Sequence, residues 1–134
     1  MSQENLEIAR AAYDAWNKGD LQFVLDRLHP DVEWEENAQV YPGLDPVYHG
    51  HEGFLKRQRD AFDAWEWFTV EDAEFIDAGE HVVVPLRLTA KGRHSGIEVE
   101  MTVCDVLTLH DGRLVRHRVY ANRADALKAV GLEE

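Results

Sequence analysis

The sequence is poor in cysteine and has no long apolar run. Cys104 is the single cysteine of the 134 residues, which excludes a disulfide within the chain and is typical of a reducing cytosol. The longest apolar run, residues 82–86, is far shorter than the roughly 20 residues that cross a bilayer. The first residues have no basic segment followed by an apolar stretch, so no signal peptide is expected. These absences favour a cytoplasmic protein that does not interact with membranes.

Positive charge is also scarce. Lys and Arg number 14 against 26 Asp and Glu, which gives a net charge of −12. Residues 1–80 carry 19 acids and 6 bases, whereas residues 81–134 carry 7 acids and 8 bases. Because binding to phosphate backbones depends on Lys and Arg, nucleic acid is not an expected partner. The acidic surplus is interpreted as a solvated helical surface that keeps the protein soluble.

Motifs for cofactors and metals are missing. The chain has no phosphate-binding glycine loop and no dinucleotide fingerprint, so no cofactor is expected. His49, His51 and Glu52 form a short cluster of ligand-type residues, but no further group with ligand spacing follows it. This segment is interpreted as a polar loop, and no metal is expected.

The first part of the chain has helical periodicity. One apolar stripe is followed by a break at Gly19-Asp20, then by a second stripe that Pro30 should stop. The first stripe consists of Leu6, Ala9, Tyr13 and Trp16, and the second of Leu21, Val24, Leu25 and Leu28. A third helix is predicted over about 51–66, with Phe54, Phe62 and Trp65 on one side.

The rest of the chain alternates with a period of two, as strands do. Strands are predicted at 32–36, 69–76, 82–90, 97–109 and 114–120, with a loop over 37–50 and a short helix at about 123–130. Helices followed by strands joined by hairpins indicate an α+β fold. We therefore expect a single domain over 1–134, in which three N-terminal helices pack in a strongly curved antiparallel sheet. Such a curl encloses a pocket if side chains do not fill it.

Three ionisable residues interrupt apolar rows of the predicted strands: Glu36, Asp105 and His117. An unpaired buried carboxylate costs several kcal/mol or becomes neutral, so such residues are candidates for catalysis. Each also has a structural explanation. Glu36 could reach water at the end of its strand, Asp105 could pair with a core hydroxyl or an arginine, and His117 could bond locally.

Apolar side chains from the same rows, together with aromatic residues of the helices, are candidates to line the pocket. Most of the aromatic set should be core, with some of it facing a cavity. The candidate ligand-binding residues are Tyr13, Trp16, Trp34, Phe54, Trp65, Val84, Leu86, Met101, Val103 and Val119.

Several short motifs, in this order, resemble the SnoaL-like branch of the nuclear-transport-factor-2-like superfamily. They are AYDAWNKGD at 12–20, PDVEW at 30–34, YHG at 48–50 followed by Glu52-Gly53, LHDGRLV at 109–115, Tyr120, and ALKAVGL at 126–132. The resemblance covers essentially the whole chain. It implies a cone of three helices against a curved sheet, usually dimeric, with a pocket in the cone. Members include ketosteroid isomerases, polyketide cyclases, dehydratases, epoxide hydrolases and proteins without known activity.

Comparison with ketosteroid isomerases, by counting from the shared motifs, implies roles for two of the three candidates. Their catalytic base falls on Glu36 and their oxyanion-hole aspartic acid on Asp105. Their first-helix tyrosine falls on Ala12, one residue before Tyr13. Many SnoaL-like relatives carry histidine at the position of Asp105. Ketosteroid isomerase is the standard example of an acid kept neutral by an apolar site, and the resemblance implies the same for Asp105.

The leading hypothesis is an acid–base enzyme of isomerase, lyase-type cyclase, dehydratase or hydrolase kind, acting on a small apolar carbonyl-like substrate. Glu36 would take a proton next to a carbonyl or activate water. Asp105, held protonated, would hydrogen-bond the developing oxyanion or donate the proton back, and His117 would orient the substrate or serve as a second acid–base group. The alternative is a noncatalytic module that binds a hydrophobic ligand or serves for dimerisation. In either case a homodimer is expected through the outer sheet face. That face should carry Arg87, Glu98, Glu100, Thr102, Cys104, Arg116 and Arg118.

Overall fold

A computed structural model describes residues 2–37, 40 and 43–132. Within this part the chain forms four helices and seven strands. They are α1 (Ser2–Asn17), α2 (Leu21–Asp26), β1 (Leu28–Glu35), β2 (Val47–His49), α3 (Gly50–Ala64), β3 (Trp65–Glu71), β4 (Ile76–Ala78), β5 (His81–Gly92), β6 (Glu98–His110), β7 (Arg113–Tyr120) and α4 (Arg123–Ala129). None of the described helices is both long enough and apolar enough to cross a membrane.

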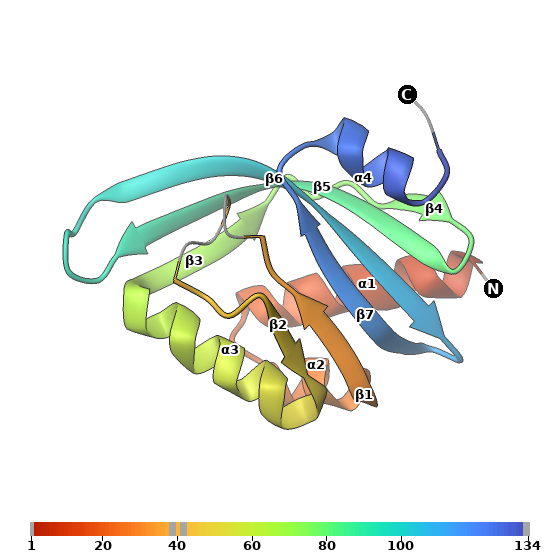
Figure 1. Cartoon of the computed structure of the whole chain (residues 1–134), viewed down its shortest axis with the longest axis horizontal. Helices are drawn as coiled ribbons and strands as arrows, with labels where there is room; N and C mark the ends of the chain where they lie inside the picture. Colours follow the sequence, from red (N-terminus) through yellow and green to blue (C-terminus); the bar gives the residue numbers. More distant parts are fainter. Residues whose placement is uncertain (1, 38–39, 41–42, 133–134) are drawn as a thin grey trace.

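The strands form one curved sheet in the order β2-β1-β7-β6-β5-β3, with β4 added beside β5. Neighbouring strands are antiparallel except for β1 and β7, which run parallel. Figure 1 shows α1 and α3 on one side of the sheet and α4 on the other. The predicted α+β fold, with three helices held in a strongly curved sheet, is confirmed.

The first two helices are close to the prediction, except at the end of the second. Asp20 caps α2, since its Oδ1 accepts a hydrogen bond from the backbone N–H of Phe23 at 3.1 Å. The expected stop at Pro30 was wrong, because α2 already ends at Asp26 and β1 begins at Leu28. Leu114 N–H donates to the carbonyl of Arg27 at 2.8 Å, and this bond starts the pairing of β1 with β7.

The third helix is shorter than predicted. It ends at Ala64, so Trp65 begins β3 and does not belong to the helix. The prediction that Phe62 shares a packed side with Phe54 was wrong, since Phe62 is 40% exposed and Phe54 is fully buried. The short strand β2 lies within the predicted loop 37–50, of which residues 38–39 and 41–42 fall outside the described residues.

The strand predicted at 69–76 is divided into two. β3 ends at Glu71 and β4 begins at Ile76, and Asp72 between them has a positive φ of 52°. The interruption lies opposite Pro85 of β5, between the last β3 partner at Arg87 and the first β4 partner at Val83. Proline has no N–H to donate to a neighbouring strand, so a continuous ladder cannot run past this position.

A bulge changes which residues of β7 face the helices. Thr108 pairs with Arg116 but Leu109 pairs with Leu114, so Val115 is an extra residue in the ladder. Leu114 is therefore buried and Val115 only half-buried, whereas regular alternation along β7 would place Val115 on the inner face with His117.

The outer sheet face is partly covered by the chain itself. Cys104 was predicted on the open outer face, but it is 1% exposed and packs with Ala126 and Leu127 of α4. The uncovered part is strongly charged, and Arg87 there forms ion pairs with Glu71, Asp72 and Glu100. This leaves a smaller and more polar surface for a second copy than the sequence indicated.

Candidate active site

One pocket opens between the inner sheet face and the helices α1, α2 and α3. Its walls are mainly apolar, and the lining side chains that carry polar atoms are Tyr13, Trp16, Arg27, Trp34, Arg57, Asp105 and His117. The cavity has a volume of about 80 Å³. The pocket is therefore narrow, and a ligand that enters without moving side chains must be slim.

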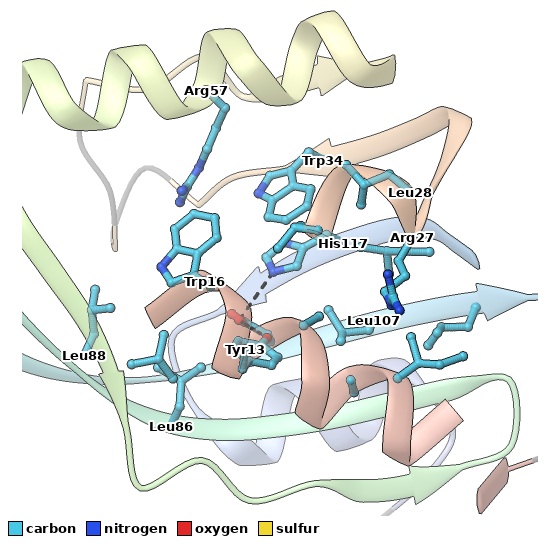
Figure 2. A pocket seen from close by; sticks show the side chains of 18 of the residues that line it. Tyr13, Trp16, Arg27, Leu28, Trp34, Arg57, Leu86, Leu88, Leu107 and His117 are labelled. Atoms are coloured by element: carbon cyan, nitrogen blue, oxygen red, sulfur yellow. Dashed lines mark hydrogen bonds and ion pairs between the residues drawn. The ribbon is translucent and has the colours of Figure 1, made fainter. Parts of the chain in front are cut away.

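Three of its polar residues form a chain of contacts (Figure 2). The hydroxyl of Tyr13, on α1, donates to Asp105 Oδ2 at 2.5 Å. The same oxygen lies 3.3 Å from His117 Nε2, so strands β6 and β7 supply the other two members. Asp105 and His117 are each 6% exposed. The contact to Tyr13 therefore agrees with the structural explanation offered for Asp105 from the sequence, in which this residue pairs with a core hydroxyl.

Trp34 of β1 covers one face of the His117 ring. The two rings are stacked with centroids 4.0 Å apart and an angle of 10° between their planes. This contact depends on the parallel pairing of β1 with β7, which places Trp34 opposite His117. The stack fixes the plane of the imidazole ring, so packing holds the ring at its distance from Asp105.

Several buried polar atoms at the pocket have no hydrogen-bond partner within the described part of the chain. They are Asp105 Oδ1, His117 Nδ1 and Trp34 Nε1. An unsatisfied buried polar atom costs about 1–3 kcal/mol, so three of them around one cavity is an unusual concentration. Because these atoms have almost no accessible surface, a bound molecule could satisfy them only if neighbouring side chains move.

Glu36 is placed differently from the expectation. Its carboxylate is 1% exposed, which contradicts the alternative that it reaches water, and its Oε1 accepts from Arg57 Nε at 2.6 Å. Glu36 is not among the residues that line the pocket, whereas Arg57 is. The guanidinium carbon of Arg57 lies 5.6 Å from the Trp16 ring centroid and 6.0 Å from those of Trp34 and Phe68.

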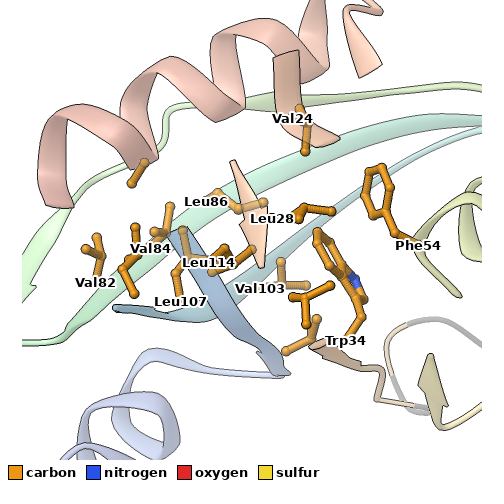
Figure 3. Packing of buried hydrophobic residues seen from close by; sticks show 14 of the residues in the cluster. Val24, Leu28, Trp34, Phe54, Val82, Val84, Leu86, Val103, Leu107 and Leu114 are labelled. Atoms are coloured by element: carbon orange, nitrogen blue, oxygen red, sulfur yellow. The ribbon is translucent and has the colours of Figure 1, made fainter. Parts of the chain in front are cut away.

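Of the ten candidate ligand-binding residues, four line the pocket: Tyr13, Trp16, Trp34 and Leu86. The other six do not line it. Phe54, Val84, Val103 and Val119 are buried in the core, while Trp65 and Met101 are half-buried. Figure 3 shows Phe54, Val84 and Val103 packed among other apolar side chains. The three candidate catalytic residues are likewise divided, since Asp105 and His117 meet at the pocket and Glu36 lies behind Arg57.

Sequence reasoning missed both arginines of the pocket wall, Arg57 and Arg27, as well as most of its apolar residues. A signal for Arg57 was present. Buried residues of α3 include Phe54, Arg57 and Ala61, so this arginine interrupts an apolar helical stripe as Asp105 interrupts an apolar strand row. No comparable signal marked Arg27, because α2 was expected to continue past it.

The cluster His49, His51 and Glu52 does not gather around a common centre. All three are exposed, and His51 Nε2 lies 2.9 Å from the carbonyl oxygen of Leu28. Across residues 2–37, 40 and 43–132, no group of three or more His, Cys, Asp or Glu side chains is arranged to hold a metal ion.

The fold and pocket define a cone-shaped α+β protein with a small-molecule cavity, of the nuclear-transport-factor-2-like type. The sequence profile of the SnoaL-like domain matches residues 9–117, and the chain belongs to the SnoaL-like family. No curated protein matches the sequence.

Solved structures with the same fold cover nearly the whole chain. A protein of unknown function from Burkholderia pseudomallei, described as NTF2-like, is 25% identical with a TM-score of 0.80, over 96% of this chain and 98% of that one. A protein from Xanthomonas campestris, provisionally assigned as a polyketide cyclase, is 19% identical with a TM-score of 0.78. The match covers 96% of this chain and 98% of that one. TerC, crystallised with polyporic acid, is 23% identical with a TM-score of 0.79, over 95% and 98%.

Proposed function

We propose that the chain is an acid–base enzyme that moves a proton within a small apolar substrate carrying a carbonyl group, without a cofactor. The observation that supports this most is the contact chain from Tyr13 through Asp105 to His117 at the pocket wall, with Asp105 Oδ1 left without a partner in the described structure. Isomerisation, cyclisation and dehydration can all proceed through such a proton transfer. The provisional assignment of the Xanthomonas relative as a polyketide cyclase agrees with this type of chemistry.

In this proposal Asp105 is the proton acceptor. Its Oδ2 is held by the Tyr13 hydroxyl and faces His117, which leaves Oδ1 to take a proton from the substrate carbon next to the carbonyl. The electron pair of that C–H bond moves into an enolate, whose oxygen needs a donor. Trp34 Nε1–H, which has no acceptor among the described residues, could supply it, and Arg57 adds positive charge to the wall. Asp105 then returns the proton to a second atom of the substrate.

Glu36 has a positioning role in this proposal and does not act as the base. The carboxylate offsets the charge of Arg57 and fixes the direction of its guanidinium. His117 orients Asp105 and is the second group able to exchange a proton, since its Nδ1 has no partner in the described structure.

Hydrogen–deuterium exchange in candidate substrates tests the proposal. A panel of cyclic ketones and lactones would be incubated with the protein in D₂O, and loss of the α-hydrogen signal followed by NMR. Asp105→Asn should slow exchange by about 10²–10⁴-fold, because general acid–base catalysis contributes that much. Asp63→Asn is the matched control, since Asp63 is exposed and outside the pocket. Exchange by Asp105→Asn at the wild-type rate would contradict the assignment.

A second candidate is a noncatalytic module that binds a small apolar ligand. The observation in its favour is the placement of Glu36. This residue was expected to act as the base, but it is paired with Arg57 and does not line the pocket. Binding of members of the panel without exchange or turnover of any of them would favour this function.

We also propose a homodimer formed through the uncovered part of the outer sheet face. Charged residues of both signs lie there on neighbouring strands, among them Arg87, Glu100 and Arg116. Opposite charges suit a twofold contact in which the same surface meets itself.

A further inference from the structure

Two arginines line the pocket, and only one of them has a counter-charge in the described structure. Arg57 is paired with Glu36 at 2.6 Å. Arg27 forms no ion pair within 4.0 Å with any described Asp or Glu. This is notable in a chain with 26 acidic residues and 14 basic ones. In Figure 2 the two side chains enter the pocket region from different sides, with His117 between them.

Arg27 is held in a defined place. Its backbone follows the last residue of α2, and its carbonyl accepts from Leu114 N–H at 2.8 Å. The guanidinium lies flat on the Phe23 ring, with its carbon 3.4 Å from the ring centroid, and Nη1 donates to the Phe23 carbonyl at 3.2 Å. An arginine stacked in this way loses little further freedom when it binds a ligand.

A purely structural role would be to cap α2. The bond from Nη1 to the Phe23 carbonyl is of that kind, since it satisfies a carbonyl of the helix. Capping uses one of the five N–H donors of the side chain and does not require the guanidinium to lie at a cavity wall. The position of Arg27 in the pocket is therefore not explained by the cap.

We infer that Arg27 binds the carboxylate of the ligand, and that the natural ligand is a slim apolar carboxylic acid. The acid group would pair with Arg27 while the apolar body extends along Leu107 and Leu86 towards Asp105. The guanidinium matches a carboxylate through two parallel N–H donors, and the apolar walls strengthen that attraction. This inference rests on the proposed function, because it takes the same pocket as the binding site.

The net charge of −12 makes the inference more specific. An acidic surface repels anions in general, so preference for an acid over its neutral analogue must come from a local cation. Arg57 is a poorer source of that preference, because Glu36 already compensates its charge.

The test compares a carboxylate with its amide, which differ in charge but hardly in shape. Binding of 4-phenylbutyrate and 4-phenylbutanamide would be measured by calorimetry at low salt. The wild-type protein should bind the acid about tenfold or more tightly than the amide, as expected for a charge-assisted pair. Arg27→Met should remove this preference. Arg59→Met, which deletes the same charge from an exposed position, should keep it.

The ratio of the two affinities separates binding from capping. Loss of a cap would weaken both probes together, whereas loss of a carboxylate partner weakens only the acid. If Arg27→Met folds poorly, Arg27→Lys takes its place. Lysine keeps the positive charge but lacks the two parallel N–H donors of the guanidinium, so this variant should retain a reduced preference for the acid over the amide. Equal binding of acid and amide to the wild type would overturn the role of Arg27 alone. Failure of both probes to bind would count against the proposed pocket ligand as well.

Discussion

The buried pair of Glu36 and Arg57 allows a stability prediction that can be worked out from the structure. Their side chains are 1% and 5% exposed, and a single short hydrogen bond of 2.6 Å joins them. Removing one partner of a buried ion pair costs about 3–5 kcal/mol. We therefore expect Glu36→Leu to lower the free energy of unfolding by that amount, and Arg57→Met to do the same.

The double variant Glu36→Leu/Arg57→Met should behave differently. It removes both charges and replaces them with apolar groups, and such replacements are often neutral or stabilising. Its free energy of unfolding should lie within about 1 kcal/mol of the wild type, far above the sum of the two single effects.

Urea unfolding followed by tryptophan fluorescence would measure all four proteins. For a chain of this size each kcal/mol moves the melting temperature by about 3–5 °C, so the single variants should melt about 9–25 °C lower. Since whole domains are stable by only about 5–15 kcal/mol, the single variants would be close to unfolding at 37 °C. Additive losses in the double variant, or single variants as stable as the wild type, would refute the reasoning.

Three further predictions concern other parts of the molecule. Tyr13→Phe removes the donor to Asp105 Oδ2 and should cost about 1 kcal/mol in urea unfolding, together with slower exchange on any ketone substrate; an unchanged exchange rate would contradict the role of the hydroxyl. Burial lowers the pKa of His81 below its usual 6.5, so the neutral form is favoured in the folded state and stability should fall as the pH drops below about 6.5. In His81→Gln that part of the acid sensitivity should disappear from the urea midpoints at pH 7 and pH 5.5. Light scattering at micromolar concentration should give twice the chain mass of 15.4 kDa, and a monomer mass would contradict the proposed dimer.

The sequence predicted residues of the site best where strands are regular. In β6 and β7 the alternation is clear, so a charge on an apolar row could be recognised, and Asp105 and His117 do meet at one pocket. Where the ladder is irregular the same reasoning fails. The bulge at Val115 breaks the alternation of β7, so this residue does not face the side of the sheet that a regular strand would give it. No local pattern in the sequence marks the bulge.

Contacts between distant elements could not be predicted in this way. Family spacing placed the helix tyrosine on Ala12, and only the tertiary arrangement shows that the hydroxyl of Tyr13 reaches Asp105. Glu36 was recognised correctly as an acid on an apolar row, but its partner lies on a helix 21 residues later. The alternation of a strand shows which charged residues lie on an apolar face. The residue that pairs with each of them depends on tertiary packing and cannot be found from the alternation.

The parallel pairing of β1 with β7 has a consequence for folding. It joins residues 28–35 to residues 114–120, which are far apart along the chain, while the other ladders of the sheet join segments closer in sequence. Contacts that close long loops form slowly, because the entropy of the loop is lost before the contact is gained. The Trp34–His117 stack lies on this seam, so the site should be completed only when the two ends of the chain meet, after the β5–β6–β7 hairpins have formed.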